Sequence, residues 1–576
     1  MITDPILLEV LWNRLLAVVN EQQVVLQRTA FSTVVRETQD LACGVFDAEG
    51  RMIAQSLTGT PGHINAMATG LKHFLAVFPP TTLADGDVLL TNDPWQTAGQ
   101  VNDMTVVTPV FLDAALVGYF ASTCHSPDIG GRILSAEARE VFEEGLRIPI
   151  CKLFHAGEPD PLLLQIICAN VRTPDETVGD LYAQTSANAV GARALLALLR
   201  EFSLPGIAPL ADAIVVRSEQ ALRTAIRALP DGVYTSESWS DGFEEPIVIR
   251  VAVTIAGDAI TIDFAGSSPQ STRGINVVLN YTHAYASFAI KAALSPDVPH
   301  NEGAFRPVHV TAPAGSILNC RSPAPVASRH IIGHMLPGVI FAALEPILGE
   351  KLLAGGADSI WMSVWRGALP ASDDLFTFTL FQCGGSGARA HKDGLSATGF
   401  PSGVAGVPAE VVEALAPLIQ HRRELRTDSG GAGRQRGGLG QRSSVSRRGS
   451  GAWSVSALGD RTRFAAQGFA GGMPGALGVI ELRDGSRPQP KSLITLASDA
   501  QIALDPPGGA GYGQPHTRPV AQVLADVVAG YVSIAAAARE YGVVIRYTGA
   551  PDALVRLARH YAVDAVATAA ARGESA

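Results

Sequence analysis

Carboxylate, amide and imidazole side chains gather at three places in the first part of the chain, and each place borders a predicted strand. The side chains concerned are those of Asp40, Asn92, Asp93, Gln100, Asp103, His125 and Asp128. Carboxylate oxygens and imidazole nitrogens bind divalent cations, and the same groups transfer protons in hydrolytic reactions. The sequence therefore favours either a metal site or acid–base chemistry in this part of the chain.

Each place also has an interpretation without function. Asp40 precedes an apolar strand predicted at residues 41–46, and its carboxylate could simply cap a turn. The amides and carboxylates of residues 92–103 could satisfy the backbone of their own loop, although loops on a rigid sheet often carry sites. A lone histidine such as His125 is more often structural than catalytic. Taken together, however, Asp40, Asp103 and His125 predict a shared oxygen-and-nitrogen site.

Three loops, at residues 383–394, 428–433 and 436–440, are rich in glycine. Such loops can present backbone N–H groups to an anion, or they can serve tight turns and close packing, which we favour. None of them matches the GxxxxGK[ST] phosphate loop or a strand–GxGxxG–helix unit. The sequence therefore contains no nucleotide site of a known type.

Apolar spacing and turn residues predict the elements that position these side chains. A helix begins at Asp4-Pro5, where an N-cap carboxylate precedes a proline at the first helical position. Further helices are predicted at residues 64–78, 161–201 (broken near Thr173-Pro174), 283–294 and 520–541. Strands are predicted at residues 41–46, 51–55, 88–91, 104–111 and 116–123, with two more within 247–263.

The order of these elements shows no regular βαβ repeat. We therefore predict an α+β or mixed α/β fold of several layers, in which several mixed sheets are flanked by helices. We divide the chain into an N-terminal α/β region with the candidate site (1–205), a central mixed α/β region (206–375), a glycine-rich α+β region (376–545) and a helical tail (546–576).

Composition and charge exclude several classes of protein. The chain has 576 residues, 47% of them hydrophobic, which is enough for a large core and too apolar for a disordered chain. A net charge of −10 does not favour binding to nucleic acid, and we interpret the basic run at residues 434–448 as a surface loop. No apolar run is long enough to span a membrane, the start of the chain lacks the features of a signal peptide, and the six cysteines form no CxxC pair. We expect a cytoplasmic protein.

The same polar places lie within sequence blocks that resemble the hydantoinase B/oxoprolinase family. The resemblance extends over residues 4–545, and many blocks in one order make it more specific than any single motif. The blocks are Arg36-Glu37 with Asp40, Phe46–Arg51, Thr91–Trp95, Asp103–Phe111, Asp128–Gly131, Glu144-Gly145, Asn170–Arg172, Gly179–Leu181 with Gln184, Asn301–Gly303 with Arg306-Pro307, Pro323–Pro325, Leu425–Gly433, Arg436–Gly440 and Tyr541–Val544.

The resemblance implies the B-type subunit of a two-component enzyme. In the family, an A-type subunit with an actin-like ATPase fold phosphorylates the amide or carbonyl oxygen, and the B-type subunit completes hydrolysis. We therefore expect a hetero-oligomer with an A-type ATPase partner, which uses the ATP, and a cyclic amide substrate such as a hydantoin or 5-oxoproline. A component of a ketone carboxylase, as in the acetone and acetophenone carboxylase branches, and a non-catalytic scaffold for the ATPase remain alternatives.

The resemblance also implies a metal site built from an aspartate at position 40, a His-x-x-Asp pair ending at Asp103, and His125. In this chain Gln100 replaces the histidine of that pair, which implies weaker binding of Zn, a preference for Mg or Mn, or no metal. The candidate metal ligands are thus Asp40, Gln100, Asp103 and His125. The candidate catalytic residues are His125, Asp103 and Asp93, and the candidate substrate-binding residues are Asn92 and Asp128.

Overall fold

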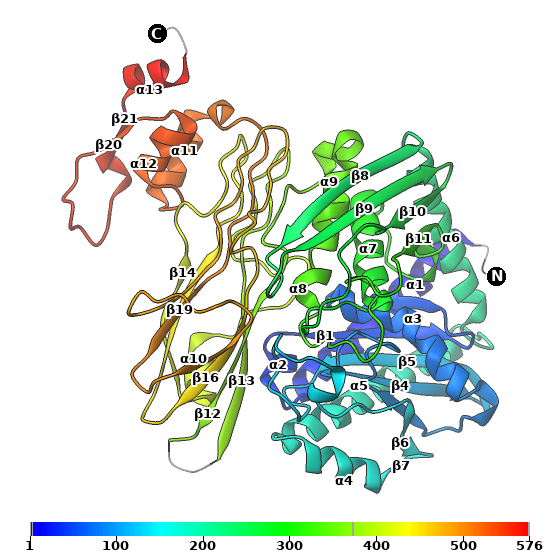
Figure 1. Ribbon diagram of the computed structural model, residues 1–576. Coiled ribbons are helices and arrows are strands. Elements are labelled where there is room, and N and C mark those ends of the chain that lie inside the picture. Colours follow the sequence, from blue (N-terminus) through cyan, green and yellow to red (C-terminus); the bar gives the residue numbers. More distant parts are fainter. Residues whose placement is uncertain (1, 3, 371–373, 574–576) are drawn as a thin grey trace.

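The computed structural model describes residues 2, 4–370 and 374–573, and their fold is mixed α/β with several sheets, as the sequence predicts. The N-terminal part is built on one large antiparallel sheet whose strands lie in the order β2-β1-β5-β4-β3-β6-β7 (Figure 1). The strands are β1 (Leu41–Asp47), β2 (Met52–Gln55), β3 (Val88–Thr91), β4 (Asp103–Leu112), β5 (Ala115–His125), β6 (Cys151–His155) and β7 (Glu158–Pro159). The strands predicted in this part of the chain are therefore confirmed.

Helices cover both faces of this sheet. They are α1 (Pro5–Thr29), α2 (Thr33–Arg36), α3 (Pro61–Val77), α4 (Pro161–Asn170) and α5 (Pro174–Glu201). Leu41, Cys43 and Val45 of β1 join the core that contains α1 and α5, whereas Ala42 and Phe46 join the core that contains α3. Because successive side chains of a strand point to opposite faces, this alternation shows that β1 is buried on both sides.

Local signals explain where the first helices begin and end. The side chain of Asp4 accepts the backbone N–H of Ile6 at 2.9 Å, and Pro5 occupies the first helical position of α1. The predicted break near Thr173 is confirmed, since α4 ends at Asn170 and α5 begins at Pro174. A proline that begins a helix leaves no unpaired N–H inside it.

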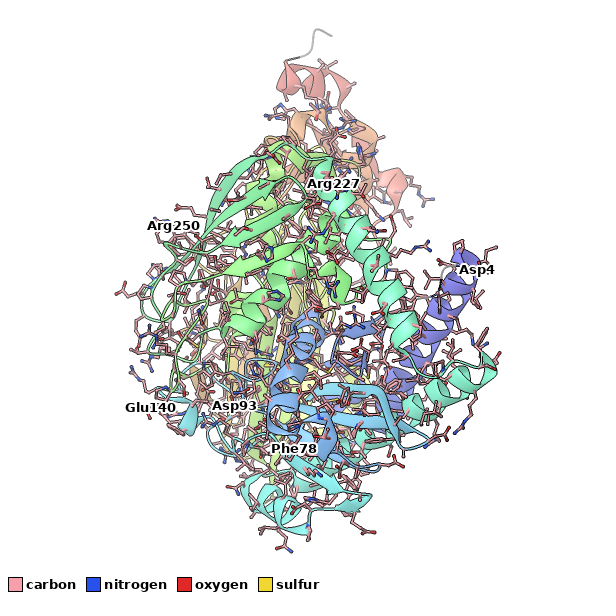
Figure 2. All side chains as sticks on the ribbon, turned by 90° about the vertical axis from the view of Figure 1, so that its right-hand side faces the viewer. Asp4, Phe78, Asp93, Glu140, Arg227 and Arg250 are labelled. Carbon is pink, nitrogen blue, oxygen red and sulfur yellow. The ribbon has the colours of Figure 1, made fainter. Side chains whose placement is uncertain are left out.

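The central part of the chain adds a smaller sheet, with the order β11-β10-β9-β8, and four helices. The elements are α6 (Ala208–Arg227), β8 (Gly232–Ser240), β9 (Ile247–Ala256), β10 (Ala259–Asp263), α7 (Leu279–Leu294), β11 (Val308–Thr311), α8 (His330–Gly333) and α9 (Leu336–Leu348). Figure 2 shows α6, which ends at Arg227, beside α1, whose start is marked by Asp4. Side chains of the first and central parts share one continuous apolar core.

Within the described part of the chain, one helical stretch, His330–Lys351, is long and apolar enough to cross a membrane by length and composition alone. It is divided between α8 and α9, and 72% of its most apolar window is buried inside the protein. Packing of α9 against α7, β8 and β9 accounts for this composition. The stretch therefore has the properties of a core helix.

Two four-stranded sheets follow in the C-terminal part, with the orders β13-β12-β16-β18 and β14-β15-β19-β17. Their elements are β12 (Trp361–Ala368), β13 (Leu375–Gln382), α10 (Ala409–Leu415), β14 (Leu418–Leu425), β15 (Gln441–Arg447), β16 (Trp453–Leu458), β17 (Val479–Leu482), β18 (Leu493–Leu496) and β19 (Gln501–Asp505). The two sheets enclose a separate core that includes the stacked rings of Trp365 and Trp453, whose centres lie 5.4 Å apart.

The glycine-rich loops run as long extended segments next to these sheets, and they pack backbone against backbone (Figure 1). A Cβ at Gly385 would lie 1.8 Å from the carbonyl oxygen of Gly438, and one at Gly509 would lie 1.9 Å from that of Ser386. The segments also exchange backbone hydrogen bonds, for example from the N–H of Gly509 to the carbonyl oxygen of Gly438 at 2.9 Å. Close packing, the interpretation favoured from the sequence, therefore explains these glycines.

The basic run at residues 434–448 is not the surface loop that we expected. Strand β15 occupies its second half, and Arg436 and Arg447 are buried. The guanidinium of Arg436 lies over the ring of Tyr531 at 5.1 Å and faces Asp526 at 3.5 Å. Arg436 therefore holds the last helices against the glycine-rich segments, whereas Arg447 donates to the carbonyl oxygen of Ala368 at the end of β12.

The chain ends in a small unit that packs on the glycine-rich segments (Figure 1). It contains α11 (Val520–Val528), α12 (Ile534–Tyr541), β20 (Ile545–Tyr547), β21 (Tyr561–Val563) and α13 (Ala565–Arg572). Beyond residue 545 the tail is thus a strand pair followed by a helix, rather than a helix throughout. The division of the chain at residues 205, 375 and 545 stays a prediction.

Candidate active site

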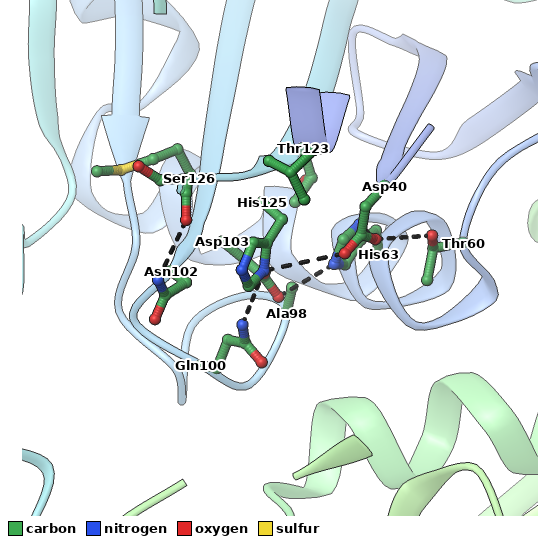
Figure 3. A network of polar contacts seen from close by, with 12 residues as sticks. Asp40, Thr60, His63, Ala98, Gln100, Asn102, Asp103, Thr123, His125 and Ser126 are labelled. Carbon is green, nitrogen blue, oxygen red and sulfur yellow. Dashed lines mark hydrogen bonds and ion pairs between the residues drawn. The ribbon is translucent and has the colours of Figure 1, made fainter. Parts of the chain in front are cut away.

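The register of the large sheet brings three polar residues together at one end of neighbouring strands (Figure 3). Asp103 of β4 faces His125 of β5 directly, and the next strand, β1, begins at Leu41, which faces Cys124. Asp40 immediately precedes β1, and its carbonyl oxygen accepts the backbone N–H of His125 at 3.1 Å. Asp40, Asp103 and His125 are far apart in the sequence and lie close together because the strands pair in this register.

A second histidine, His63, joins this group from the first turn of α3. Its Nε2 lies 3.1 Å from Oδ2 of Asp103, and its Nδ1 lies 3.6 Å from Oδ1 of Asp40. Thr60, the residue before α3, donates its hydroxyl to the same oxygen of Asp40 at 3.0 Å. The side chains of His63 and Asp103 are 2% and 0% exposed, so water does not screen their interaction. His63 therefore bridges the two carboxylates.

The guanidinium of Arg329 completes the group from the central part of the chain. It donates from Nη2 to Oδ2 of Asp103, from Nη1 to Oε1 of Gln100, and from Nε to the carbonyl oxygen of Ala98. Its central carbon lies 4.1 Å from the ring centre of Tyr281, which is a favourable cation–π distance. Arg329 is thus held on every side by acceptors and by an aromatic ring.

Two glycines provide the space for this arrangement. Gly99 has φ +89°, and a Cβ there would lie 2.8 Å from Cδ of Arg329, so both its backbone and its surroundings require glycine. Gly62 precedes His63 in α3, and a Cβ there would lie 2.3 Å from the ring of Tyr281. The small residues therefore allow α3, α7 and Arg329 to approach one another.

The hydrogen bonds of Gln100 assign the proton position on His125. A guanidinium only donates, so the Gln100 atom that faces Arg329 is the amide oxygen Oε1. The amide nitrogen Nε2 then faces Nδ1 of His125 at 2.9 Å and donates to it. Nδ1 is therefore an acceptor in the neutral ring, and Nε2 carries the hydrogen. Oδ1 of Asp103, at 3.2 Å from the same Nδ1, accepts a hydrogen bond only when Nδ1 carries a hydrogen.

The charges of the group offset one another. Burial raises the pKa of Asp103, but the charges of Arg329 and His63 outweigh it and hold that pKa well below its ordinary value. Burial lowers the pKa of His63, but the charges of Asp103 and Asp40 outweigh it, so the net pKa lies above the ordinary value. Asp103 is therefore ionised, and His63 takes up a proton readily.

We call the six residues described above the polar cluster: Asp40, His63, Gln100, Asp103, His125 and Arg329. All of them except Asp103 line a cavity of about 30 Å³, which has room for one or two water molecules. The remaining walls are formed by Thr60, Tyr281, His330, His334, Ile360, Met362, Phe381, Ser402 and Val404. Burial and the nearby charges of Arg329 and His125 lower the pKa of His330 to about 3, so its ring is neutral.

The polar cluster does not fit a metal ion in this arrangement. A divalent ion needs free lone pairs on several ligands at roughly 2.0–2.3 Å. Of the predicted ligands, Asp103 and Gln100 each give an oxygen to Arg329, and His125 accepts from Gln100 through Nδ1. Among the described residues, no group of three or more His, Cys, Asp or Glu side chains is arranged to hold a metal ion. Arg329 takes the place of the cation, and we derive no step through a metal.

Three residues predicted for the site lie outside the polar cluster and do not line its cavity. Asn92 is buried, and its amide donates to two backbone carbonyl oxygens and accepts one backbone N–H, so it fixes the loop. Asp93 accepts the backbone N–H of Trp95 at 3.0 Å within its own turn. Asp128 accepts hydrogen bonds from the backbone N–H and guanidinium of Arg172. The contacts of these three side chains are those of structural residues.

Sequence reasoning missed His63 and Arg329. His63 lies at the start of an apolar helix, where a single histidine is not distinguished from a core residue. The signal that was present is Gly62-His63 directly after Pro61, a polar residue in the first turn of a buried helix. Arg329 is separated from Asp103 by 226 residues, so no local pattern connects the two.

Comparison with known proteins agrees with this fold. The sequence matches the family described as hydantoinase B/oxoprolinase over residues 4–515. It is 31% identical to the caprolactamase subunit beta of Pseudomonas jessenii, with 95% of this chain and 97% of that protein covered. It is 27% identical to the 5-oxoprolinase PfmaA of Pestalotiopsis fici, with 89% of this chain and 41% of that protein covered. The crystal structure of the ATP-dependent caprolactamase from Pseudomonas jessenii superposes over all of both chains with a TM-score of 0.89 and 28% identity.

Proposed function

Since the chain belongs to the hydantoinase B/oxoprolinase family, we propose that it is the B-type subunit of an ATP-dependent amidohydrolase. Its substrate in this proposal is a cyclic amide, such as a hydantoin, 5-oxoproline or a larger lactam. A separate A-type subunit uses ATP to phosphorylate the carbonyl oxygen of the ring. The similarity to a caprolactamase subunit, and to an ATP-dependent caprolactamase structure, supports this assignment.

The observation that carries the proposal is the water-sized cavity beside His63. Nδ1 of His63 is buried and has no hydrogen-bond partner among the described residues, whereas its Nε2 is held by Asp103. A buried histidine with one nitrogen held by a carboxylate and the other without a hydrogen bond, although it lies 3.6 Å from Oδ1 of Asp40, has the arrangement of a general base. The side chains of His63 and Asp40 both line the cavity, so a water molecule there would lie beside them.

The proposed reaction uses two histidines in different roles. His63 removes a proton from the water through Nδ1 while the water oxygen bonds to the activated carbon of the ring. His63 then returns this proton to the ring nitrogen while the C–N bond breaks, and the hydroxyl group of the tetrahedral intermediate gives the second proton of the water to the same nitrogen as its C=O bond forms. His125 donates a hydrogen bond from its Nε2 to the oxygen that carries the phosphate, and it keeps this hydrogen. The products of this step are an amine and an acyl phosphate, and a second water hydrolyses the acyl phosphate. Asp103 does not line the cavity, so it acts by holding His63 and by stabilising its protonated form.

Arg329 supplies the fixed positive charge of the site in this proposal. It lines the cavity and keeps Asp103 ionised, so a negatively charged, phosphorylated substrate meets a cation. Fixed charges in a site shielded from water stabilise developing charge more strongly than the same charges in solution. The replacement of histidine by Gln100 agrees with this role, because its amide oxygen accepts from Arg329 and an imidazole nitrogen bearing hydrogen would not.

The test is to reconstitute the chain with an A-type ATPase partner and to measure ring opening of several lactams by the appearance of the free amine. We expect ring opening that needs ATP and both subunits, and that falls in the His63→Gln and His125→Gln variants. An unchanged rate of ring opening in both variants would contradict the assignment of the active site to the polar cluster. ATP turnover that depends on bicarbonate, without release of an amine, would instead indicate a carboxylase.

A further inference from the structure

The four-stranded sheet β14-β15-β19-β17 has one face in the core of the C-terminal part and one face toward solvent. Ile480 of β17 and Ile502 of β19 point into that core, which this sheet encloses together with the sheet β13-β12-β16-β18. Strand β13 of the second sheet contacts α2 of the N-terminal part, so β14 and β19 lie on the outside of the molecule (Figure 1). Because side chains alternate along a strand, Glu481 and Ala503 point away from the core.

A hollow of about 470 Å³ lies on this outer face. Ser444 of β15 pairs with Ala503 of β19, and Ala503 pairs in turn with Glu481 of β17. The serine and alanine side chains in the middle of this row are short, so the longer side chains around them enclose a hollow. We call it the arginine groove, because its lining includes four arginines, Arg422, Arg426, Arg442 and Arg487.

Two of the four arginines have a carboxylate partner within the groove. Nη2 of Arg442 lies 2.8 Å from Oδ2 of Asp505, and Nε of Arg487 lies 3.0 Å from Oε2 of Glu481. These two carboxylates neutralise only half of the positive charge that lines the groove. The outer face of the sheet therefore carries excess positive charge, although the net charge of the whole chain is −10.

Arg426 has no carboxylate partner of this kind. Its Nη1 donates to the carbonyl oxygen of Leu477 at 2.7 Å, and no ion pair joins its guanidinium to a carboxylate in the described part of the chain. Burial lowers the pKa of Arg426, and the opposing charges of Asp505 and Arg442 leave that pKa below its ordinary value. A partly buried guanidinium without its own carboxylate is stabilised when an external anion binds beside it.

Arg422 is the second arginine whose charge is not closely paired. Its Nη1 lies 3.9 Å from Oε1 of Glu424, which is too far for a hydrogen bond. The side chains of Arg422 and Arg487 are 62% and 67% exposed, and those of Arg426 and Arg442 are partly exposed. A partner in the groove can therefore reach these guanidinium groups.

The width of the groove indicates which kind of anion fits. Arg422 is on β14, the first strand of the sheet, and Arg487 pairs with Glu481 of β17, the last strand. Three spacings between neighbouring strands amount to about 14 Å. A phosphate or a single carboxylate reaches only the arginines next to it, whereas an extended peptide of about four residues spans this distance at about 3.3 Å per residue. The groove therefore fits an extended acidic segment of a protein better than a small anion.

We propose that the arginine groove docks an extended acidic segment of the A-type subunit. Carboxylates of that segment pair with Arg422 and Arg426, and the short side chains of Ser444 and Ala503 let its backbone approach the sheet. The choice of the A-type subunit rests on the proposed function. Arginine is enriched at protein interfaces, and complementary charges there speed association and orient the partner.

The experiment mixes the full chain with the A-type subunit and measures the dissociation constant by titration calorimetry. The groove variant carries Arg422→Glu with Arg487→Glu. The control variant carries Arg227→Glu with Arg250→Glu, which changes the net charge equally at two exposed arginines that also have one carboxylate partner each and do not line the groove. We expect the groove variant to bind about tenfold or more weakly and the control variant to bind as wild type does. Equal affinities of the two variants would overturn the proposal.

Two further measurements distinguish docking from a general effect of the substitutions. Urea denaturation should give similar midpoints for both variants, because all four side chains are exposed and surface ion pairs contribute little to stability. The affinity of wild type should fall as the NaCl concentration rises, and that of the groove variant should fall less, since salt screens exposed charges. A wild-type affinity that does not change with salt would overturn the proposal.

The rate of ring opening separates this proposal from the proposed function. The four arginines of the groove do not line the cavity of the polar cluster, so the groove variant should open the ring at the wild-type rate when the A-type subunit is saturating. Weaker binding by the groove variant, without ATP-dependent ring opening by any complex, would contradict the amidohydrolase assignment and leave the groove. Ring opening by the wild-type complex, with an equal affinity in the groove variant, would overturn the groove and leave the amidohydrolase.

Discussion

The guanidinium of Arg329 donates a hydrogen bond to the buried carboxylate of Asp103 across 226 residues of sequence. Both side chains are almost completely shielded from solvent, with exposures of 4% and 0%. The pair connects the central part of the chain to the end of the large sheet, where a metal ion would otherwise be expected. The contribution of this pair to the stability of the chain can be measured.

Replacement of Arg329 by methionine should destabilise the chain by about 3–5 kcal/mol, because it leaves the charge of Asp103 buried and unpaired. Denaturation by urea measures this free energy of unfolding. The double variant Arg329→Met with Asp103→Asn should lose less than the sum of the single losses, since no ionised carboxylate then remains. Additive losses in this double-mutant cycle would mean that the two side chains are not coupled.

Replacement of Gly99 by alanine should destabilise the chain by about 2–4 kcal/mol, because it combines a strained backbone with a collision against Arg329. The matched control is Gly157→Ala, since Gly157 has φ +96° but nothing lies within 4 Å of the added Cβ. That control should lose only about 1 kcal/mol, which is the backbone contribution. Equal losses in the two variants would show that Arg329 does not occupy the space next to Gly99.

Replacement of His63 by glutamine should reduce the rate of ATP-dependent ring opening by about 10²–10⁴, as expected for loss of a general base. His73→Gln is the control, because His73 lies on the same helix and does not line the cavity of the polar cluster. Substrate binding should change little in either variant. A rate that falls equally in both would indicate a general effect on α3 instead of loss of the base.

Glu144 should make the stability of the chain depend on pH. Burial raises its pKa to about 8, although the backbone N–H groups of Ala327 and Val326 favour its ionised form. The folded chain therefore binds this proton more tightly than the unfolded chain. The contribution is complete below the unfolded pKa of about 4.5 and is lost as pH rises towards 8, with a slope of at most about 1.4 kcal/mol per pH unit. Glu144→Gln removes this slope, so wild type should lose stability relative to the variant between pH 5 and 8.

Unfolding curves of wild type and Glu144→Gln at each pH measure the difference. Curves that stay parallel over this range would mean that Glu144 is ionised in the folded chain and that its second oxygen, Oε2, finds a partner.

The local part of the fold could be predicted from the sequence. Short apolar runs and turn residues located β1, β2, β4 and β5, and the same signals placed Asp40, Asp103 and His125 at strand ends. Antiparallel pairing then made it reasonable that these residues lie close together, because the end of β5 is next to the start of β4. The interpretation of the glycine-rich loops as closely packed segments was also confirmed, since their backbones pack against one another.

The other features of the site depend on tertiary contacts, which local sequence patterns do not indicate. Asn92 and Asp128 are of residue types that often occur in sites. The polar atoms of Asn92, however, hydrogen-bond to nearby backbone, and those of Asp128 hydrogen-bond to Arg172. The pairing of Gln100 with Arg329 is visible only when two distant segments are placed side by side. The catalytic roles of His125 and Asp103 stay predictions.

The central claim is that Arg329, and not a metal ion, supplies the positive charge of the polar cluster. Diffraction data from crystals of the full chain grown with excess Mn²⁺, collected to record its anomalous scattering, test this claim most directly. We predict no anomalous peak within coordination distance of Asp103, and the guanidinium of Arg329 in hydrogen-bond contact with Asp103 and Gln100. A peak at roughly 2.0–2.3 Å from Asp103 and His125, with Arg329 displaced, would contradict the claim.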